Sequence, residues 1–325
     1  MKLFSIIILI GLSLTFMSSC SSAVKKVKSQ PISIGFASWP GFDVIYYAKT
    51  TKMFEKYNLE VKLVEFSNQE AATKALDDLE VDAVMTSIWD VQHLQGNNDF
   101  DVILVTNISN GADGIVAVKD ITSLSQLKNK KISAQSNSVN ELILLEALHL
   151  HKMKTKDVVT LDMTNEKAMA KLFHEEIQAA VLWEPLLSLT QRKIDGNILF
   201  TTKEVDSMVI DLLVVHSESI QKQPKQWKDF LLVWFDLMQV LEDEPHKVLD
   251  LVGRHIENPF FSSDYAGLKA GTFALNNRMF TDNHLSDSLD KVTEMVDTQN
   301  KARIHVNKEF TKDVMKQWMN SYTQK

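Results

Sequence analysis

Three of the six tryptophans stand just after predicted strands, where α/β proteins usually bind their ligands. They are Trp39, Trp89 and Trp183. An indole offers a flat apolar face for stacking, and its π system attracts cations. Packing in the core is the alternative role, which we assign to the three tryptophans on amphipathic helices: Trp227, Trp234 and Trp318. The first three are therefore predicted to clamp a flat or cationic ligand.

Acidic side chains stand at three further positions beside predicted strand ends: Asp113, Glu184 and Asp211. A buried carboxylate is destabilised by a bound anion, but it forms a charge-assisted hydrogen bond with an amine or a protonated ring nitrogen. Glu184 precedes Pro185 and could instead simply begin a helix. No arginine precedes residue 192, so the group that suits oxyanions best is absent from the first half of the chain. These features predict a neutral or cationic, flat or amine-bearing ligand rather than a sulfonate or nitrate.

The segment Ser136-Asn137-Ser138 precedes a predicted helix and offers a different kind of site. Free backbone amides at a helix start bind anions and polar ligand atoms. Ser138 could merely cap the helix together with Glu141, but capping gives Ser136 and Asn137 no role. All three remain candidate ligand-binding residues, and they leave an anionic ligand open as the alternative.

Catalytic residues do not occur in the patterns that catalysis requires. His149 and His151 are two apart and do not share a helix face. The segment 174–176 (HEE) lacks the second histidine of a zinc-protease helix. The single cysteine, Cys20, excludes an intramolecular disulfide and a thiolate metal cluster. We therefore expect a binding protein with no cofactor and no metal, rather than an enzyme.

The first residues form a separate unit. An apolar stretch from Phe4 to Met17 is too short to span a membrane but has the length of a secretory signal. Small residues then precede Cys20, as in bacterial lipoprotein signals. We expect a signal peptide over residues 1–19, lipidation of Cys20, and a tether over residues 20–31 that holds the protein at the extracytoplasmic face of a membrane. The alternatives are an uncleaved anchor and a generic cleavage site beside an incidental cysteine.

The composition is that of a globular protein. With 45% hydrophobic and 24% charged residues, the chain is neither disordered nor a multi-span membrane protein. Its 325 residues suggest two domains, at roughly 100–200 residues for each. The net charge of -7 and the lack of a basic patch argue against nucleic acid as a partner.

Strand and helix patterns alternate from Ile32 to His216, which predicts an α/β fold with mostly parallel sheets. The expected helices include residues 42–57 and, within a long helical run after residue 216, residues 264–274. Because the pattern restarts near Ile121, we predict two lobes. Lobe 1 would contain residues 32–118 and 213–325, and lobe 2 residues 119–212. Two crossings between the lobes would form a hinge.

Five segments in this order resemble the periplasmic solute-binding proteins of ABC importers for nitrate, sulfonate, taurine and thiamine-precursor pyrimidines. They are 39–41 (WPG), 53–61 (MFEKYNLEV), 82–87 (DAVMTS), 111–117 (GADGIVA) and 179–185 (AAVLWEP). The similarity covers about residues 31–220. Residues 88–90 depart from the family pattern, in which an acid stands earlier in that turn. The resemblance implies a two-lobed type II periplasmic-binding-protein fold that closes on a small ligand in the inter-lobe cleft.

The resemblance also implies a monomer that delivers its ligand to an ABC permease. It adds Pro40, Gly41 and Ser87 as ligand-binding candidates and places a binding residue at Glu184. Tyr46 joins them because it and its neighbour point about 100° apart on a helix, so that only one can face the cleft. Three alternatives remain: a sulfonate, taurine or nitrate ligand, a ligand sensor for a membrane receptor, and a pyrimidine synthase or dehydratase of the same fold.

Overall fold

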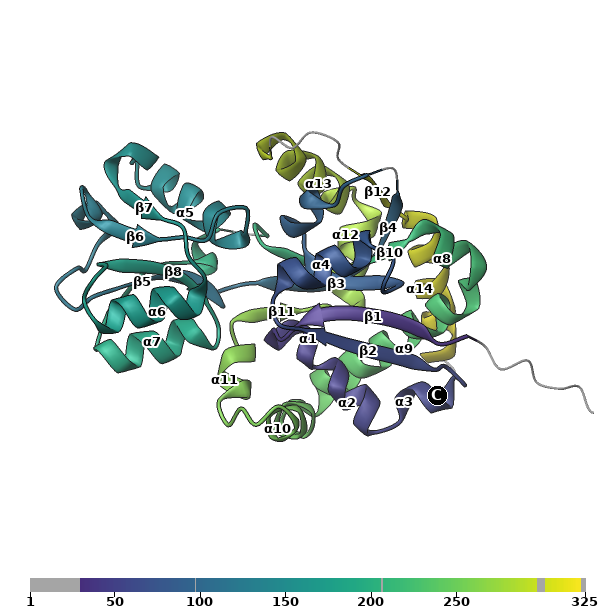
Figure 1. The fold of residues 1–325 in the computed structure, drawn as a ribbon. Helices are drawn as coiled ribbons and strands as arrows, with labels where there is room; N and C mark the ends of the chain where they lie inside the picture. The colour runs from purple at the N-terminus through teal and green to yellow at the C-terminus, as the bar shows by residue number, and fades with distance from the viewer. Residues whose placement is uncertain (1–29, 97, 206, 297–301, 323–325) are drawn as a thin grey trace, which may run out of the picture.

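The computed structural model describes residues 30–96, 98–205, 207–296 and 302–322. The predicted signal peptide and Cys20 lie outside these residues. Two β-sheets, each covered by helices, are joined side by side (Figure 1). The predicted α/β fold with two units is therefore confirmed. The expectation of mostly parallel sheets is wrong, because five of the ten strand pairings between the described residues are antiparallel. Within the described ranges, no helix has both the length and the apolar character that crossing a bilayer requires.

The larger sheet has seven strands in the order β11-β4-β10-β3-β1-β2, with β12 also paired to β4. The strands are β1 (Ile32–Ala37), β2 (Val61–Phe66), β3 (Ala83–Ser87), β4 (Asp99–Ser109), β10 (Ile210–His216), β11 (Leu268–Ala270) and β12 (Arg303–Val306). Strands β1, β2 and β3 are parallel, whereas β10 is antiparallel to both β3 and β4. The start of β10 therefore lies at the carboxyl ends of β3 and β4.

The helices of the larger sheet come from both ends of the chain. They are α1 (Pro40–Asp43), α2 (Ile45–Thr50), α3 (Met53–Lys56), α4 (Gln69–Asp77), α8 (Ser217–Lys222), α9 (Pro224–Asp243), α10 (Pro245–His255), α11 (Phe261–Tyr265), α12 (Phe273–Thr281), α13 (His284–Met295) and α14 (Lys308–Tyr322). The core role predicted for the last three tryptophans is confirmed, because Trp227 and Trp234 on α9 and Trp318 on α14 are buried.

The smaller sheet has the order β7-β6-β8-β5-β9. Its strands are β5 (Asp113–Ala117), β6 (Lys131–Ser133), β7 (Val159–Leu161), β8 (Ala179–Trp183) and β9 (Asn197–Thr201). Its helices are α5 (Val139–Leu150), α6 (Asn165–Phe173) and α7 (Leu186–Ile194). Here too β6 runs parallel to β7 and β8, so their carboxyl ends share one edge.

The chain passes between the sheets at two places that lie in contact. The first crossing joins β4 to β5 and the second joins β9 to β10. The Ser109 and Thr202 hydroxyls lie 2.7 Å apart, and the Gly111 N–H donates to Thr202 Oγ1 at 2.7 Å. Gly111 has φ +119°, a conformation that suits glycine best. These contacts hold the two crossing segments together as one narrow connection.

The sheet pairing moves the predicted lobe boundaries. Strand β5 pairs with β8 and β9, so residues 113–117 lie in the smaller sheet rather than in lobe 1, where the sequence pattern had placed them. Strand β10 pairs with β3 and β4 from its first residues, so residues 210–212 lie in the larger sheet rather than in lobe 2. The partners of a strand determine which sheet it belongs to, and the alternation of apolar residues along the chain does not reveal those partners.

Two predicted helices are also wrong in their extent. Residues 42–57 contain the end of α1 and the short helices α2 and α3. Lys52, with φ 61°, ends the helical path between α2 and α3. Residues 264–274 contain the end of α11, the strand β11 and the start of α12. Gly271 ends that strand close against β4, where a Cβ atom would lie 2.4 Å from the Val105 carbonyl oxygen.

Candidate functional site

Polar residues from three strands meet on one face of the larger sheet. In the strand register, Asp211 at the start of β10 lies opposite Ser87 at the end of β3 and opposite Asn107 near the end of β4. Directly opposed residues in adjacent strands point to the same face. The three side chains therefore lie in a row at the edge of the sheet where the chain leaves β4 for the smaller sheet.

Asp90, just beyond β3, belongs to this row. The Ser87 hydroxyl donates to Asp90 Oδ2 at 2.8 Å, and the Asp90 N–H donates to Ser87 Oγ at 3.0 Å. Burial raises the pKa of Asp90 to about 6, although the Ser87 bonds act in the opposite direction. Ser87, a predicted ligand-binding residue, thus holds a second carboxyl group in place.

Asp113 brings a third carboxyl group from the smaller sheet. It begins β5 opposite Trp183 at the end of β8 and is only 2% exposed. Burial raises the pKa of Asp113 to about 7, the Ser109 hydroxyl lowers it, and the charge of Glu184 raises it further. Burial likewise raises the pKa of Asp211, and Asp113 is the next largest cause. The two aspartates, one from each sheet, are thus close enough to repel each other when both are ionised.

Several buried polar atoms of this group have no hydrogen-bond partner. They are Oδ2 of Asp113, Oδ2 of Asp211 and Nε1 of Trp89. Among the ion pairs of the described residues, none includes Asp90, Asp113 or Asp211. Buried polar atoms are normally paired, so two such carboxylate oxygens indicate a place for an N–H donor. By the carboxyl group of the site we mean the set formed by the three side chains of Asp90, Asp113 and Asp211 together.

Trp39 connects this carboxyl group to the first helix. Its Nε1 donates to Asn107 Oδ1 at 3.3 Å, and the indole lowers the pKa of Asp211. Trp39 and Trp183 contact the same apolar cluster, whereas Trp89 packs in another cluster and lies near His93, with ring centroids 6.1 Å apart. The structure therefore packs two of the three predicted clamp residues in one apolar cluster and the third, which directly precedes Asp90, in another.

Gly41 allows the close approach of Asn107. A Cβ atom at Gly41 would lie 2.1 Å from Asn107 Nδ2 and 2.4 Å from its Cγ. Pro40 is buried at the first position of α1, directly after Trp39 at the helix N-cap. Gly41 thus leaves room for Asn107, and Pro40 belongs to the start of the helix.

We expect Gly41→Ala to displace the Asn107 amide and break its bond to Trp39. Overpacking of this kind costs roughly 1–3 kcal/mol, which should lower the melting temperature in calorimetry. The double variant Gly41→Ala/Asn107→Ser should regain most of that loss, because the shorter side chain leaves room for the methyl group. An unchanged melting temperature in Gly41→Ala would refute this role for the glycine.

Glu184 has a structural role at the start of α7. The Ser188 N–H donates to its Oε2 at 3.1 Å, and the Ser188 hydroxyl donates to its Oε1 at 2.5 Å. Burial raises the pKa of Glu184, while Arg192 lowers it. Arg192 also lies over the Phe260 ring at 5.1 Å, which places one arginine nearer to the site than the sequence indicated. Both oxygens of Glu184 are thus already paired, as expected of a residue that begins a helix.

The predicted anion site at the start of α5 is filled by the protein's own acids. The Ser136 N–H donates to Asp162 Oδ1 at 2.9 Å, and the Asn137 N–H donates to Glu141 Oε2 at 2.8 Å. Ser138 Oγ accepts from the Asn140 N–H at 3.2 Å. An anion here would have to displace a carboxylate from each of the first two amides.

Tyr46 lies apart from the carboxyl group. Its hydroxyl donates to Glu65 Oε2 at 2.7 Å, and its ring contacts that of His255, with centroids 4.4 Å apart.

Two residues with unpaired buried polar atoms were not predicted from the sequence. Asp43, near Tyr46, is only 2% exposed and its Oδ1 has no hydrogen-bond partner. Tyr265 on α11 was also missed, and its buried hydroxyl is unpaired. The sequence signal that could have identified Asp43 is an acidic residue within an otherwise apolar segment.

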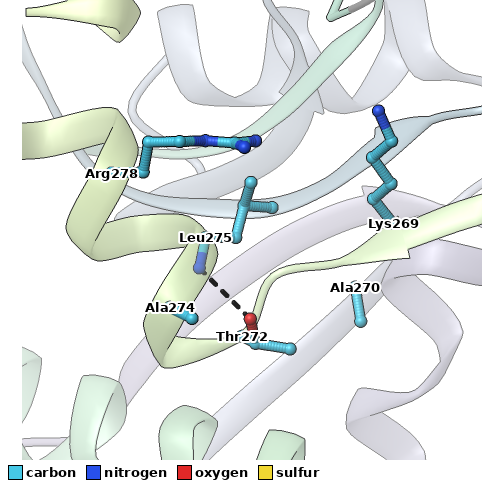
Figure 2. A pocket seen from close by; sticks show the side chains of 6 residues that line it. All are labelled: Lys269, Ala270, Thr272, Ala274, Leu275 and Arg278. Carbon is cyan, nitrogen blue, oxygen red and sulfur yellow. Dashed lines mark hydrogen bonds between the residues drawn. The ribbon is translucent and has the colours of Figure 1, made fainter. Parts of the chain in front are cut away.

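The described residues contain no group of three side chains suited to hold a metal ion. One cavity of about 250 Å³ lies between β11 and α12, at the edge of the larger sheet. Figure 2 shows Lys269 and Arg278 above it, with the Leu275 N–H donating to Thr272 Oγ1 at 3.2 Å. This cavity is lined by no member of the carboxyl group.

Sequence comparison identifies related chains. The family model described as NMT1/THI5 like matches residues 39–246. A protein of Brucella abortus (strain 2308), whose name describes a candidate binding protein, is 22% identical over 290 residues. The match covers 87% of this chain and 85% of that relative.

Solved structures share the fold at low identity. The ligand-binding component of an ABC-type import system from Staphylococcus aureus, with zinc bound, has a TM-score of 0.69 and 16% identity, covering 88% of this chain and 99% of that one. The periplasmic aliphatic sulphonate binding protein SsuA of Escherichia coli has a TM-score of 0.65 and 17% identity, covering 79% and 94%. The desulfurization enzyme DSZB has a TM-score of 0.68 and 10% identity, covering 90% and 99%. Binding proteins and an enzyme thus share this fold.

Proposed function

The chain belongs to the NMT1/THI5-like family, and from this premise we propose that it is the solute-binding protein of an ABC importer. It captures a small, amine-bearing or heteroaromatic solute between its two sheets by hinge closure and delivers it to a membrane permease. The relative named for binding and the importer component among the structural neighbours support the class of function. They leave the solute to be inferred from the site.

The observation that supports a cationic solute is the pair of buried, unpaired carboxylate oxygens on Asp113 and Asp211. Each aspartate comes from a different sheet, so an ammonium or protonated ring nitrogen between them would join the two halves of the molecule. Such a bond is charge-assisted and strongest when shielded from water. The occupied amides at Ser136 and Asn137 disfavour the sulfonate and nitrate alternatives.

The solute can be identified directly. The protein purified from its source organism should release, on denaturation, a solute that mass spectrometry identifies as amine-bearing. Recovery of an alkanesulfonate, taurine or nitrate in stoichiometric amount would contradict the proposed chemistry. A second experiment addresses an enzymatic role, which the fold of DSZB raises. The identified solute is incubated with the protein, and a binding protein returns it chemically unchanged.

We further propose that Cys20 is the lipidated first residue of the processed protein, with residues 1–19 removed. Cys20→Ser should release the protein from the membrane without changing its melting temperature, because the substitution alters none of the residues that form the two sheets and their helices. Intact-mass analysis should give an acylated chain that begins at residue 20. A chain that retains residues 1–19, or an unmodified Cys20, would contradict this proposal.

A further inference from the structure

Asp43 resembles the two central aspartates of the site but lies at a different place. It sits on α1, is 2% exposed, and its Oδ1 has no hydrogen-bond partner. The Ser38 hydroxyl donates to its other oxygen at 2.9 Å. Burial raises the pKa of Asp43 to about 7, and the charge of Glu65 raises it further. No ion pair within the described part of the chain includes Asp43.

Trp39 links Asp43 to the carboxyl group. The Trp39 carbonyl accepts from the Asp43 N–H at 2.9 Å, so the backbone end of this residue lies beside Asp43. The indole end reaches Asn107, which lies opposite Asp211 in the strand register. Trp39 therefore contacts the backbone of Asp43 through its carbonyl and the neighbour of Asp211 through its indole, and both Asp43 and Asp211 have an unpaired oxygen.

The groups around Asp43 supply no compensating cation. Glu65 accepts from the Tyr46 hydroxyl, and the Tyr46 ring is covered by His255, with Lys49 Nζ 5.9 Å from the ring centroid. Neither His255 nor Lys49 is among the causes that shift the pKa of Asp43. A buried acid beside a second acid, with no cation, is costly to ionise unless a ligand supplies the charge.

We propose that Asp43 is a second anchoring carboxyl, so that the solute carries N–H donors at two opposite ends, one bound by Asp43 and the other by Asp113 and Asp211, with Trp39 between them. This inference rests on the proposed function and refines its solute class from an amine to a two-ended amine. A flat diamine would lie along the indole, whose face attracts cations and rings. Asp43 thereby becomes a residue that determines specificity.

The test uses matched probes that differ by one amine: p-xylylenediamine against 4-methylbenzylamine, and 1,4-diaminobutane against 1-aminobutane. Isothermal titration at pH 7.5 should give the wild-type protein at least about tenfold tighter binding of one diamine than of its monoamine. Asp43→Asn should remove that difference, whereas Asp211→Asn should weaken both members of the pair. Ser38→Ala, which deprives the carboxyl of its hydrogen bond, should reduce the difference in part.

The outcomes distinguish a failure of the second anchor from a failure of the proposed function. If the monoamines bind and Asp43→Asn leaves the diamine-to-monoamine ratio unchanged, the second anchor is wrong and the proposed function stands. Equal binding of diamine and monoamine by the wild-type protein also shows that the second anchor is wrong. If none of the four amines binds but an alkanesulfonate does, both the anchor and the proposed solute class are wrong. The melting temperature of each variant shows whether it is folded. If Asp43→Asn does not fold, the diamine-to-monoamine ratio of Ser38→Ala still tests the second anchor.

Discussion

Asp211→Asn should weaken the binding of an amine-bearing solute by at least about 30-fold, which corresponds to ~2 kcal/mol or more for the loss of a buried charge partner. The substitution keeps the shape of the side chain and removes only its ability to ionise. Asp211 lies opposite both Ser87 and Asn107, so an amide still fits the row. Asp113→Asn should have an effect of similar size, because its unpaired oxygen is the other half of the pair.

The matched control is Asp162→Asn. Asp162 is exposed and accepts from the Ser136 N–H at the start of α5. If the carboxyl group binds the solute, this variant should bind as the wild type does, in isothermal titration with the same amine. The opposite pattern, with loss in Asp162→Asn and unchanged affinity in Asp211→Asn, would place the solute at the helix start instead.

The unliganded protein should lose stability as the pH rises from about 4 to 7. The pKa values of Asp43 and Asp113 are about 7 and that of Asp90 is about 6, in each case raised mainly by burial. Between the ordinary pKa of an aspartate and these raised values, the folded state keeps protons that the unfolded state releases. The stability that these groups contribute is therefore full below about pH 4 and is lost progressively until the pH has risen through the folded-state values of 6 to 7.

The size of this effect can be measured by variants. A shift of three units at a buried aspartate corresponds to roughly 2–4 kcal/mol, so Asp113→Asn should raise the melting temperature at pH 8 and change it little at about pH 4. Asp120→Asn, an exposed acid, serves as the control and should leave the pH profile unchanged. If Asp113→Asn lowers the melting temperature at pH 8 as much as at about pH 4, then Asp113 is ionised and paired in the folded protein.

Solute binding and the stability of the empty protein depend on pH in opposite directions. The acids that would bind the solute destabilise the empty protein at neutral pH, because their ionised forms lack partners. A bound cation would lower their pKa values and restore that stability. Solute binding should therefore release protons and tighten as the pH rises from 6 to 8.

The sequence singled out Asp113 and Asp211 as acids beside predicted strands, and the structure brings them near each other for a reason that the sequence did not reveal. They lie at the starts of β5 and β10, which run antiparallel to β8 and to β3 and β4, so each acid lies at the carboxyl ends of its partner strands. The neighbour Asn107 could not be predicted, because it lies inside β4 and is brought to the edge only by its register with β10. Register depends on pairing between distant segments, which a single chain does not reveal.

Hydrogen bonds within the protein account for the other differences between the site predicted from the sequence and the site in the structure. Glu184 and Ser138 satisfy helix starts, and the acids Asp162 and Glu141 take the amides that the sequence offered to an anion. Asp162 is 26 residues from Ser136, so this competition appears only when the strands β6 and β7 are paired. The lobe boundary was misplaced for the same reason, since β5 looks like a continuation of the first unit until its partners are known.

The central claim is that the carboxyl group of Asp90, Asp113 and Asp211 binds an amine-bearing solute. A thermal-shift series on the full-length protein tests it most directly, with 4-aminopyrimidine and the benzylamine and diamine probes against taurine, an alkanesulfonate and nitrate at pH 6 and pH 8. A ligand at 100 times its dissociation constant adds about 2.7 kcal/mol, which is readily detected. We expect at least one amine to raise the melting temperature, more at pH 8 than at pH 6, and no anion to do so. Stabilisation by taurine, the sulfonate or nitrate, with no response to any amine, would contradict the claim.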